Sequence, residues 1–381
     1  MKTLKRILAA TTLLVTLGFA SEANAQVPLE NFFKNPEKAG YQISPDGKYF
    51  SYMAPYENRL NLFVQEVGSD KATRITSETV RDLAGSMWAN GHRILYIKDT
   101  AGDENFQLYG VNVDGTDSKA YTAFPKVRTT IIDPLENIDS LVIIGLNKRN
   151  PQVFDPYRLN LNNGELTQLA ENPGNIQGWM TDHNGKLRVA LAIVDGVNTQ
   201  ILYRETEEQP FRPVLTTNFR ETVSFATFTP DNKMVYALTN IGRDKTALVL
   251  MDPATCEEKE VLYTNDKYDI SGLGYSELKK KLISVSCTGH KGTIRHYFDK
   301  NEEAIRTKLE QKLEGYDINT TSEDKSENIR IIYAGGDRTY GTYYTYNVKE
   351  DKLTKIADLA PWIKEEDMVP MHPITYTSGM V

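Results

Sequence analysis

The stretch ISPDGKYFSYMAPYENRLNLFVQEVGSDKATRIT, residues 43–76, contains a tight turn followed by short alternating segments separated by further polar turns. Pro, Asp and Gly at 45–47 favour a turn, and the apolar–polar alternation of 49–54 is typical of a strand with one buried face. Segments 61–67 and 73–76 have the same character. With one strand placed before the turn, the stretch predicts four antiparallel strands joined by hairpins.

The same unit recurs along the chain. A turn followed by an apolar strand begins at PDGK (45), ANGH (89), LENI (135), HNGK (183) and PDNK (230), with weaker copies in ELKKKLISVS and EDKSENIRIIYA. The seven anchor positions, 44 to 48 residues apart, are Gly47, Gly91, Asn137, Gly185, Asn232, Lys279 and Ser326. This period predicts an all-β fold, a seven-bladed β-propeller of four-stranded antiparallel blades spanning 38–358. A β-sandwich is the alternative, but it does not normally repeat one unit seven times.

The sixth copy is irregular. In DKNEEAIRTKLEQKLEG, residues 299–315, Ile305, Leu309 and Leu313 recur every four residues and Gly315 ends the pattern, which predicts a short amphipathic helix on the rim of the ring. The first and last blades each contain all their own strands in order. We therefore expect the ring to close without an exchanged strand, through side-chain contacts alone.

The first 25 residues differ in kind from the rest. Lys2, Lys5 and Arg6 precede an apolar run at 7–20, and Ala-Asn-Ala at 23–25 fits a signal-peptidase site. The segment predicts a cleaved signal peptide, residues 1–25, on an exported protein that is periplasmic or secreted, with residues 26–37 as a short N-terminal segment. A retained anchor is the alternative, but the run is shorter than the roughly 20 residues that span a bilayer. We expect no membrane span after cleavage.

Charge argues against nucleic acid as a partner. The chain carries a net charge of −7, and loss of the signal, with three basic residues and one acidic residue, leaves −9. Phosphate backbones require a positive face. The acidic pairs at 207–208, 257–258 and 365–366 are interpreted as solvated surface.

Residues that could form a metal site or a disulfide show no decisive pattern. Export would permit a disulfide between Cys256 and Cys287, and the sequence leaves their pairing open, with two unpaired thiols as the simpler interpretation. In DTAGDEN, Asp99, Asp103 and Glu104 could coordinate a cation, but a hairpin-turn role is favoured. The five histidines show no ligand spacing. We expect no cofactor and no metal.

No catalytic residue can be assigned. The nearest match to the nucleophile motif G-x-S-x-G is GYSEL at 274–278, which lacks the second glycine and lies inside a blade, so Ser276 is not predicted to be a nucleophile. His290 and His296 follow it in the same blade and are expected at the surface.

Three stretches resemble the propeller region of the prolyl oligopeptidase family of serine peptidases, in particular its exported dipeptidyl and acylaminoacyl peptidases. They are WANGHRILYIKDTAGDENFQLYGVNVDG (88–115), YALTNIGRDKTALVLMD (236–252) and MVPMHPITYTS (368–378). In that family a segment like PITYTS leads into an α/β-hydrolase domain. The resemblance implies that the tail, 359–381, corresponds to the start of a linker to such a domain, which we expect this chain to lack as a truncated product or a fragment.

The resemblance implies a function in peptide gating. The propeller would admit short peptides to an active site supplied by the hydrolase domain, so this chain alone is expected to be non-catalytic, and no substrate-binding residue is assigned. A second hypothesis is a free-standing exported propeller that binds another envelope protein. A third, an enzyme of another kind such as a lyase or glycosidase, would require converging carboxylates that sequence cannot place.

Overall fold

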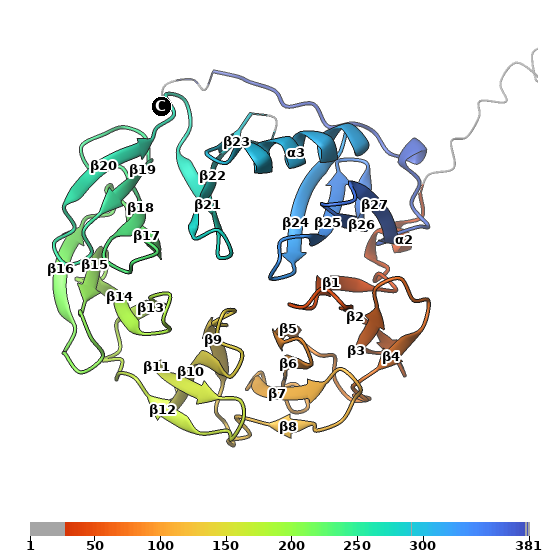
Figure 1. Cartoon of the computed structure of the whole chain (residues 1–381), viewed down its shortest axis with the longest axis horizontal. Helices are drawn as coiled ribbons and strands as arrows, with labels where there is room; N and C mark the ends of the chain where they lie inside the picture. Colours follow the sequence, from red (N-terminus) through yellow and green to blue (C-terminus); the bar gives the residue numbers. More distant parts are fainter. Residues whose placement is uncertain (1–26, 291, 378, 380–381) are drawn as a thin grey trace, which may run out of the picture.

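The computed structural model describes residues 27–290, 292–377 and 379, so the predicted signal peptide lies outside the described residues. Seven antiparallel sheets surround a common axis (Figure 1), which confirms the predicted seven-bladed β-propeller. The strands nearest the axis are β1, β5, β9, β13, β17, β21 and β24. Within the described part of the chain, no helix is both long enough and apolar enough to cross a membrane.

Each blade is built from consecutive strands. Blades one to three comprise β1 (Ala39–Ile43), β2 (Tyr49–Tyr56), β3 (Arg59–Glu66) and β4 (Ala72–Arg74); β5 (Gly85–Asn90), β6 (Arg93–Lys98), β7 (Gln107–Asn112) and β8 (Lys119–Ala120); and β9 (Thr129–Asp133), β10 (Leu141–Asn150), β11 (Val153–Asn160) and β12 (Leu166–Gln168). Blades four and five comprise β13 (Ile176–Thr181), β14 (Leu187–Val194), β15 (Asn198–Tyr203) and β16 (Arg212–Thr217); and β17 (Val223–Phe228), β18 (Val235–Thr239), β19 (Ala247–Met251) and β20 (Glu258–Tyr263).

The last two blades differ from each other. Blade six comprises β21 (Ile270–Ser276), β22 (Lys281–Gly289) and β23 (Gly292–Tyr297), and blade seven comprises β24 (Asp317–Glu323), β25 (Ile329–Gly336), β26 (Thr339–Asn347) and β27 (Lys352–Asp358). Among the described residues blade six therefore has three strands, where the repeat predicted four. The helix α3 (Lys300–Lys312) follows β23 in place of a fourth strand.

The rim helix α3 forms as the sequence predicted. The carboxylate of Asp299 caps its N-terminus by accepting hydrogen bonds from the backbone N–H groups of Asn301 and Glu302, at 2.8 and 3.2 Å. Leu309 and Leu313 are buried against Ile318 and other apolar side chains of blade seven. Burial of this stripe explains why the segment is helical rather than a continuation of the sheet.

The repeated turn has a recurring backbone structure. Gly47 has φ +73° and donates its N–H to the carbonyl of Ser44 at 2.9 Å. Asn232, at the same position in blade five, has φ +57° and donates to the carbonyl of Thr229 at 2.8 Å. Glycine and asparagine tolerate this left-handed conformation best, which explains Gly47, Asn232 and also Gly185, whose φ is +71°.

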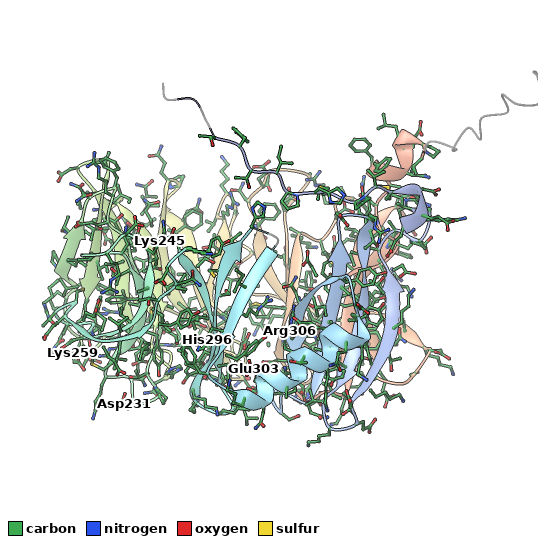
Figure 2. The ribbon with its side chains drawn as sticks, turned by 90° about the horizontal axis from the view of Figure 1, so that it is seen from above. Asp231, Lys245, Lys259, His296, Glu303 and Arg306 are labelled. Atoms are coloured by element: carbon green, nitrogen blue, oxygen red, sulfur yellow. The ribbon has the colours of Figure 1, made fainter. Side chains whose placement is uncertain are left out.

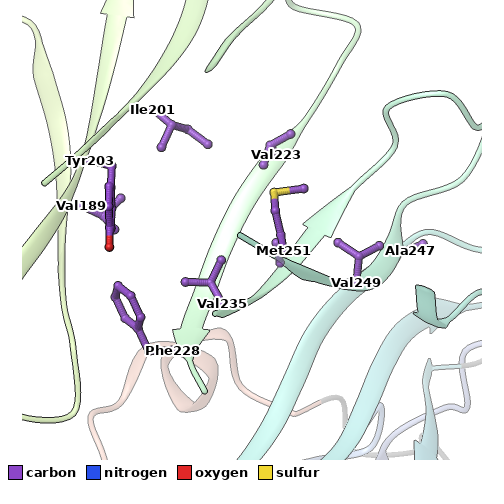
Figure 3. Packing of buried hydrophobic residues seen from close by; sticks show 10 residues of the cluster. Val189, Ile201, Tyr203, Val223, Phe228, Val235, Ala247, Val249 and Met251 are labelled. Carbon is purple, nitrogen blue, oxygen red and sulfur yellow. The ribbon is translucent and has the colours of Figure 1, made fainter. Parts of the chain in front are cut away.

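Adjacent blades are held together mainly by apolar clusters. Figure 3 shows the cluster between blades four and five, which includes Tyr203, Phe228 and Val249. Phe228 and Val249 are completely buried. A single sheet would expose these side chains, so each blade depends on its neighbours for stability.

The ring closes between blades one and seven without an exchanged strand. An apolar cluster shared by the two blades seals the junction and consists of Tyr41, Ile43, Phe50, Tyr52, Ala54 and Ile331. The expectation that side chains alone close the ring was wrong, because the backbone N–H of Lys325 donates to the carbonyl of Pro45 at 2.9 Å. The N–H of Ile43 also donates to the Ser322 hydroxyl at 3.0 Å.

Candidate functional site

The ring has two chemically different ends. Strands alternate in direction within each blade, so the turns joining first to second strands all lie at one end, and the chain enters β1 and leaves β27 at the other. In Figure 2 both terminal segments lie at the upper edge, and Asp231, in the turn of blade five, lies at the lower edge. We call these the terminal end and the turn end.

At the turn end, charged groups connect blades that are not neighbours. Lys325 of blade seven pairs with Asp139 of blade three, with 2.6 Å between Nζ and Oδ1. The Asn90 side chain of blade two donates to the Asp139 carbonyl at 3.2 Å. The Lys325–Asp139 pair spans the axis, since blades three and seven lie on opposite sides of the ring (Figure 1), whereas the Asn90 contact joins neighbouring blades.

A second group of contacts at the turn end converges on Glu277 of blade six. Its carboxylate accepts a hydrogen bond from the Asn137 side chain of blade three at 2.9 Å. It also lies 3.3 Å from Nδ1 of His183 of blade four, and that ring stacks on Tyr275 with centroids 5.4 Å apart. Turns from five blades therefore contact one another around the axis.

At the terminal end, the two segments that enter and leave the propeller are held together. The indole N–H of Trp362 donates to the Asn31 carbonyl at 2.9 Å, and the Tyr340 hydroxyl donates to the Phe32 carbonyl at 2.7 Å. The Lys34 ammonium lies 4.1 Å from the centroid of a Trp362 ring. This junction includes α2 (Leu29–Phe33) and lies close to the 3-10 turn η1 (Glu365–Asp367).

The terminal segments expose large apolar side chains. Ile374 and Tyr376 are each 81% exposed, and residues 370–377 form no strand. The same two segments also expose Leu29, Phe33, Val369 and Met371. Exposed apolar side chains gathered on one end of a molecule are typical of an interaction surface.

Ser276 is not arranged as a nucleophile. It is buried at the end of β21, where its hydroxyl donates to the Glu327 carboxylate and accepts the backbone N–H of Lys279 at 2.8 Å. An activated serine requires a base such as histidine in hydrogen-bond contact. Neither described partner of this hydroxyl is a histidine. His290 and His296 are exposed, and His296 stacks on Tyr263 with centroids 4.5 Å apart.

The other residues considered from the sequence have structural roles. Asp99 accepts the N–H of Glu104 at 3.2 Å, and Asp103 accepts the N–H of Asn105 at 3.1 Å, so the acidic groups of this loop stabilise its turn. Within the described residues, no group of three acidic, histidine or cysteine side chains could hold a metal ion.

The two cysteines are free thiols in separate environments. Cys256 packs against the cluster between blades four and five, and Cys287 is buried in the cluster between blades five and six. Burial, with Asp252 nearby, raises the pKa of the Cys256 thiol to about 11. This thiol is therefore protonated at neutral pH and has little nucleophilic character.

Two curated relatives match nearly all of the chain. It is 28% identical over 358 residues to dipeptidyl aminopeptidase BIII of Pseudoxanthomonas mexicana, covering 91% of this chain and 50% of the relative. It is 26% identical over 355 residues to dipeptidyl peptidase family member 6 of Caenorhabditis elegans, covering 87% and 47%. The chain therefore spans about half the length of the curated relatives it matches. No family model matches the chain.

Solved structures support the fold. A prolyl endopeptidase structure, from a study of interdomain dynamics in two such enzymes, matches 96% of this chain and 56% of its own with a TM-score of 0.59 and 12% identity. Prolyl oligopeptidase B of Galerina marginata matches 88% and 53% with a TM-score of 0.58 and 10% identity. Together with the sequence relatives, these matches confirm that the chain resembles the propeller region of prolyl oligopeptidase family peptidases.

Sequence reasoning missed the contacts across the turn end. Lys325, Asp139, Asn137 and Glu277 all lie in the repeated turns, but those turns deviate from the Asp-Gly pattern that first identifies the repeat. The deviation is the only available signal.

Proposed function

We propose that this chain is the non-catalytic propeller portion of a prolyl-oligopeptidase-type peptidase and that it restricts which peptides reach a hydrolase portion. The observation that carries the proposal is the match over 358 residues to half of a dipeptidyl aminopeptidase. The environment of Ser276 supports it, because this hydroxyl contacts a carboxylate rather than a histidine base.

The two ends of the ring support different parts of this function. The exposed apolar side chains of the terminal end, Ile374 and Tyr376 among them, provide a surface on which a hydrolase portion would pack. The ion pair between Lys325 and Asp139 and the contacts of Glu277 provide a restriction at the turn end. A peptide would then approach the active site between the two portions, or through the turn end only when these contacts open.

The non-catalytic part of the proposal is tested with a fluorophosphonate probe and with dipeptidyl and N-acyl-aminoacyl chromogenic substrates. We expect no labelled serine and no turnover from this chain, beside labelling of a full-length relative as the control. Stoichiometric labelling of any serine, or turnover that disappears in Ser276→Ala, would contradict the proposal.

The gating part is tested in a chimera that joins residues 27–377 to the hydrolase half of the matched dipeptidyl aminopeptidase. Lys325→Ala removes the contact with Asp139 and should raise turnover of longer peptides relative to dipeptidyl substrates. Lys233→Ala is the matched control, because the acidic partner of this turn-end lysine, within the described part of the chain, is Asp231 of its own turn, at 3.9 Å. An unchanged preference for peptide length in Lys325→Ala would refute gating at the turn end.

We also propose that the protein is exported, on the basis of residues 1–25. N-terminal sequencing of the protein from its native host should begin at Gln26. Recovery of intact residues 1–25 on the mature protein would contradict export by signal cleavage.

A further inference from the structure

A cavity of about 360 Å³ lies between blade six, blade seven and α3. Its walls are formed by β21, β22 and β23 on one side, by β24 and β25 on the other, and by one face of α3. Pockets for small organic molecules begin at about 300 Å³. The cavity therefore has room for more than a water molecule or a simple ion.

Small residues of blade six leave this space open. Ser284 and Ser286 of β22 line it together with Gly274 of β21, at a junction where a large apolar side chain would fill the gap. A Cβ atom added to Gly274 would lie only 2.7 Å from the hydroxyl oxygen of Ser284. These residues create a hollow that hydroxyl groups line.

The cavity carries an excess of positive charge. Arg295, Arg306 and Arg330 line it, with Glu302 as the one acidic side chain in the lining. Arg330 is occupied by Glu302, through contacts of 2.8 and 3.0 Å to the two carboxylate oxygens. Arg306 pairs with the more exposed Glu310 at 2.7 Å and donates to the Ile318 carbonyl at 2.6 Å.

Arg295 differs from the other two arginines. Its guanidinium donates to the side-chain oxygen of Asn319 at 3.2 Å, and among the described salt bridges it has no carboxylate partner within 4.0 Å. Burial and the charge of Arg306 lower the pKa of Arg295, and Glu310 and Asp317 offset only part of this effect. A half-buried guanidinium without a counterion is costly, and an anion in the cavity would relieve that cost.

We propose that this cavity binds a small organic anion whose carboxylate or phosphate group contacts Arg295 and Arg306. Guanidinium groups favour these two oxyanions because their N–H groups match the spacing of the oxygens. The apolar part of the ligand would lie against Leu273 and Leu309, which also line the cavity. The proposal is independent of the peptidase assignment, since it requires neither the terminal end nor a hydrolase portion. Figure 2 labels Arg306 on α3 and His296 on the adjacent strand.

The test is calorimetric titration of the purified chain with hippurate, phenyl phosphate and inorganic phosphate at constant ionic strength. The first two probes distinguish a carboxylate from a phosphate ligand, and the third lacks an apolar part. We expect saturable one-site binding of hippurate or phenyl phosphate that is tighter than that of inorganic phosphate. Arg295→Gln should weaken it about tenfold or more, as expected for loss of a charged hydrogen bond. Arg220→Gln, which removes an equal charge from an exposed loop, should change it by less than about twofold.

A second variant distinguishes loss of binding from misfolding, in case Arg295→Gln does not fold. Asn319→Asp keeps the size of an exposed side chain but places a carboxylate against Arg295, so it should also weaken binding about tenfold without lowering the urea midpoint. The proposal is overturned if neither organic probe binds saturably, if binding persists in Asn319→Asp and Arg295→Gln, or if Arg220→Gln weakens it equally.

Discussion

Two junctions between neighbouring blades are packed differently. The junction of blades four and five is apolar, whereas the junction of blades six and seven is largely polar. Ten buried apolar residues fill the first (Figure 3). The second contains a buried ion pair, hydroxyl groups and a cavity of about 360 Å³. Apolar packing maximises stability, whereas the polar junction sacrifices contact area and leaves room for a ligand. The comparison indicates that position in the ring does not dictate how a blade interface is built.

The largest loss of stability is expected from a mutation that creates a cavity in the apolar junction between blades four and five. Phe228→Ala should lower the free energy of unfolding by about 3–5 kcal/mol, because this completely buried ring contacts both blades. The measurement is urea unfolding followed by circular dichroism. Phe219→Ala, at a position 77% exposed, is the control and should change stability by less than about 0.5 kcal/mol. Equal losses in the two variants would show that the junction does not behave as a packed core.

A smaller loss is expected from breaking the ion pair of the polar junction. Arg330→Met should destabilise the protein by about 3 kcal/mol, because it leaves the buried Glu302 with Lys279 as its remaining partner. Burial raises the pKa of Glu302, but Arg330 and Lys279 outweigh it and lower the pKa below its usual range.

Arg306→Met is the matched control for Arg330→Met, because Arg306 borders the same cavity but pairs with the more exposed Glu310. It should cost less than about 1 kcal/mol. If the control cost as much as Arg330→Met, the stability of this junction would not depend on burial of the pair.

A third effect should come from the helix that borders the polar junction. Asp299→Ala removes the N-terminal cap of α3 and should cost about 1 kcal/mol in urea unfolding. Asp299→Asn retains an accepting oxygen for the cap but not the charge that pairs with Lys281, so it should recover only part of that loss. If Asp299→Asn lowered stability as much as Asp299→Ala, the effect would come from the ion pair with Lys281, at 2.7 Å, rather than from the cap.

The smallest effect is a change with pH. Lys281 and the N–H groups of α3 lower the pKa of Asp299 from 3.8 to about 2. A carboxyl group with a lowered pKa in the folded state stabilises fully above its unfolded value and loses that contribution as pH falls through the folded value. The difference in stability between wild type and Asp299→Ala should therefore be constant above about pH 5 and shrink between pH 4 and pH 2. A difference that grows toward low pH would contradict this sign.

The repeat and the rim helix were predictable because their signals are local. Gly47 and Asn232 mark turns by their backbone preference, and Leu309 and Leu313 mark a helix by their spacing. The residues that connect blades at the turn end could not be predicted, because their contact partners are remote in sequence. Lys325 and Asp139 are 186 positions apart.

Arg295 shows a different limit of sequence reasoning. It lies in the alternating polar pattern of β23, which is typical of a solvent-facing strand. Sequence alone does not reveal that this polar face meets another blade. The alternation correctly separates Arg295 from the exposed His296, but only the packing of α3 and β24 makes the Arg295 face an interior one.

The closure between blades one and seven has a mechanical consequence. The covalent chain crosses every other junction between neighbouring blades, but no peptide linkage crosses this one. Both ends of the propeller leave beside it, joined by Trp362 and Asn31. The ring is therefore covalently open at this one junction, and both terminal segments lie beside it. A pulling force applied to these two segments would load this junction before any other, so the aromatic cluster around Tyr41 and Tyr52, together with the hydrogen bonds of Lys325 and Ile43, would resist opening of the ring.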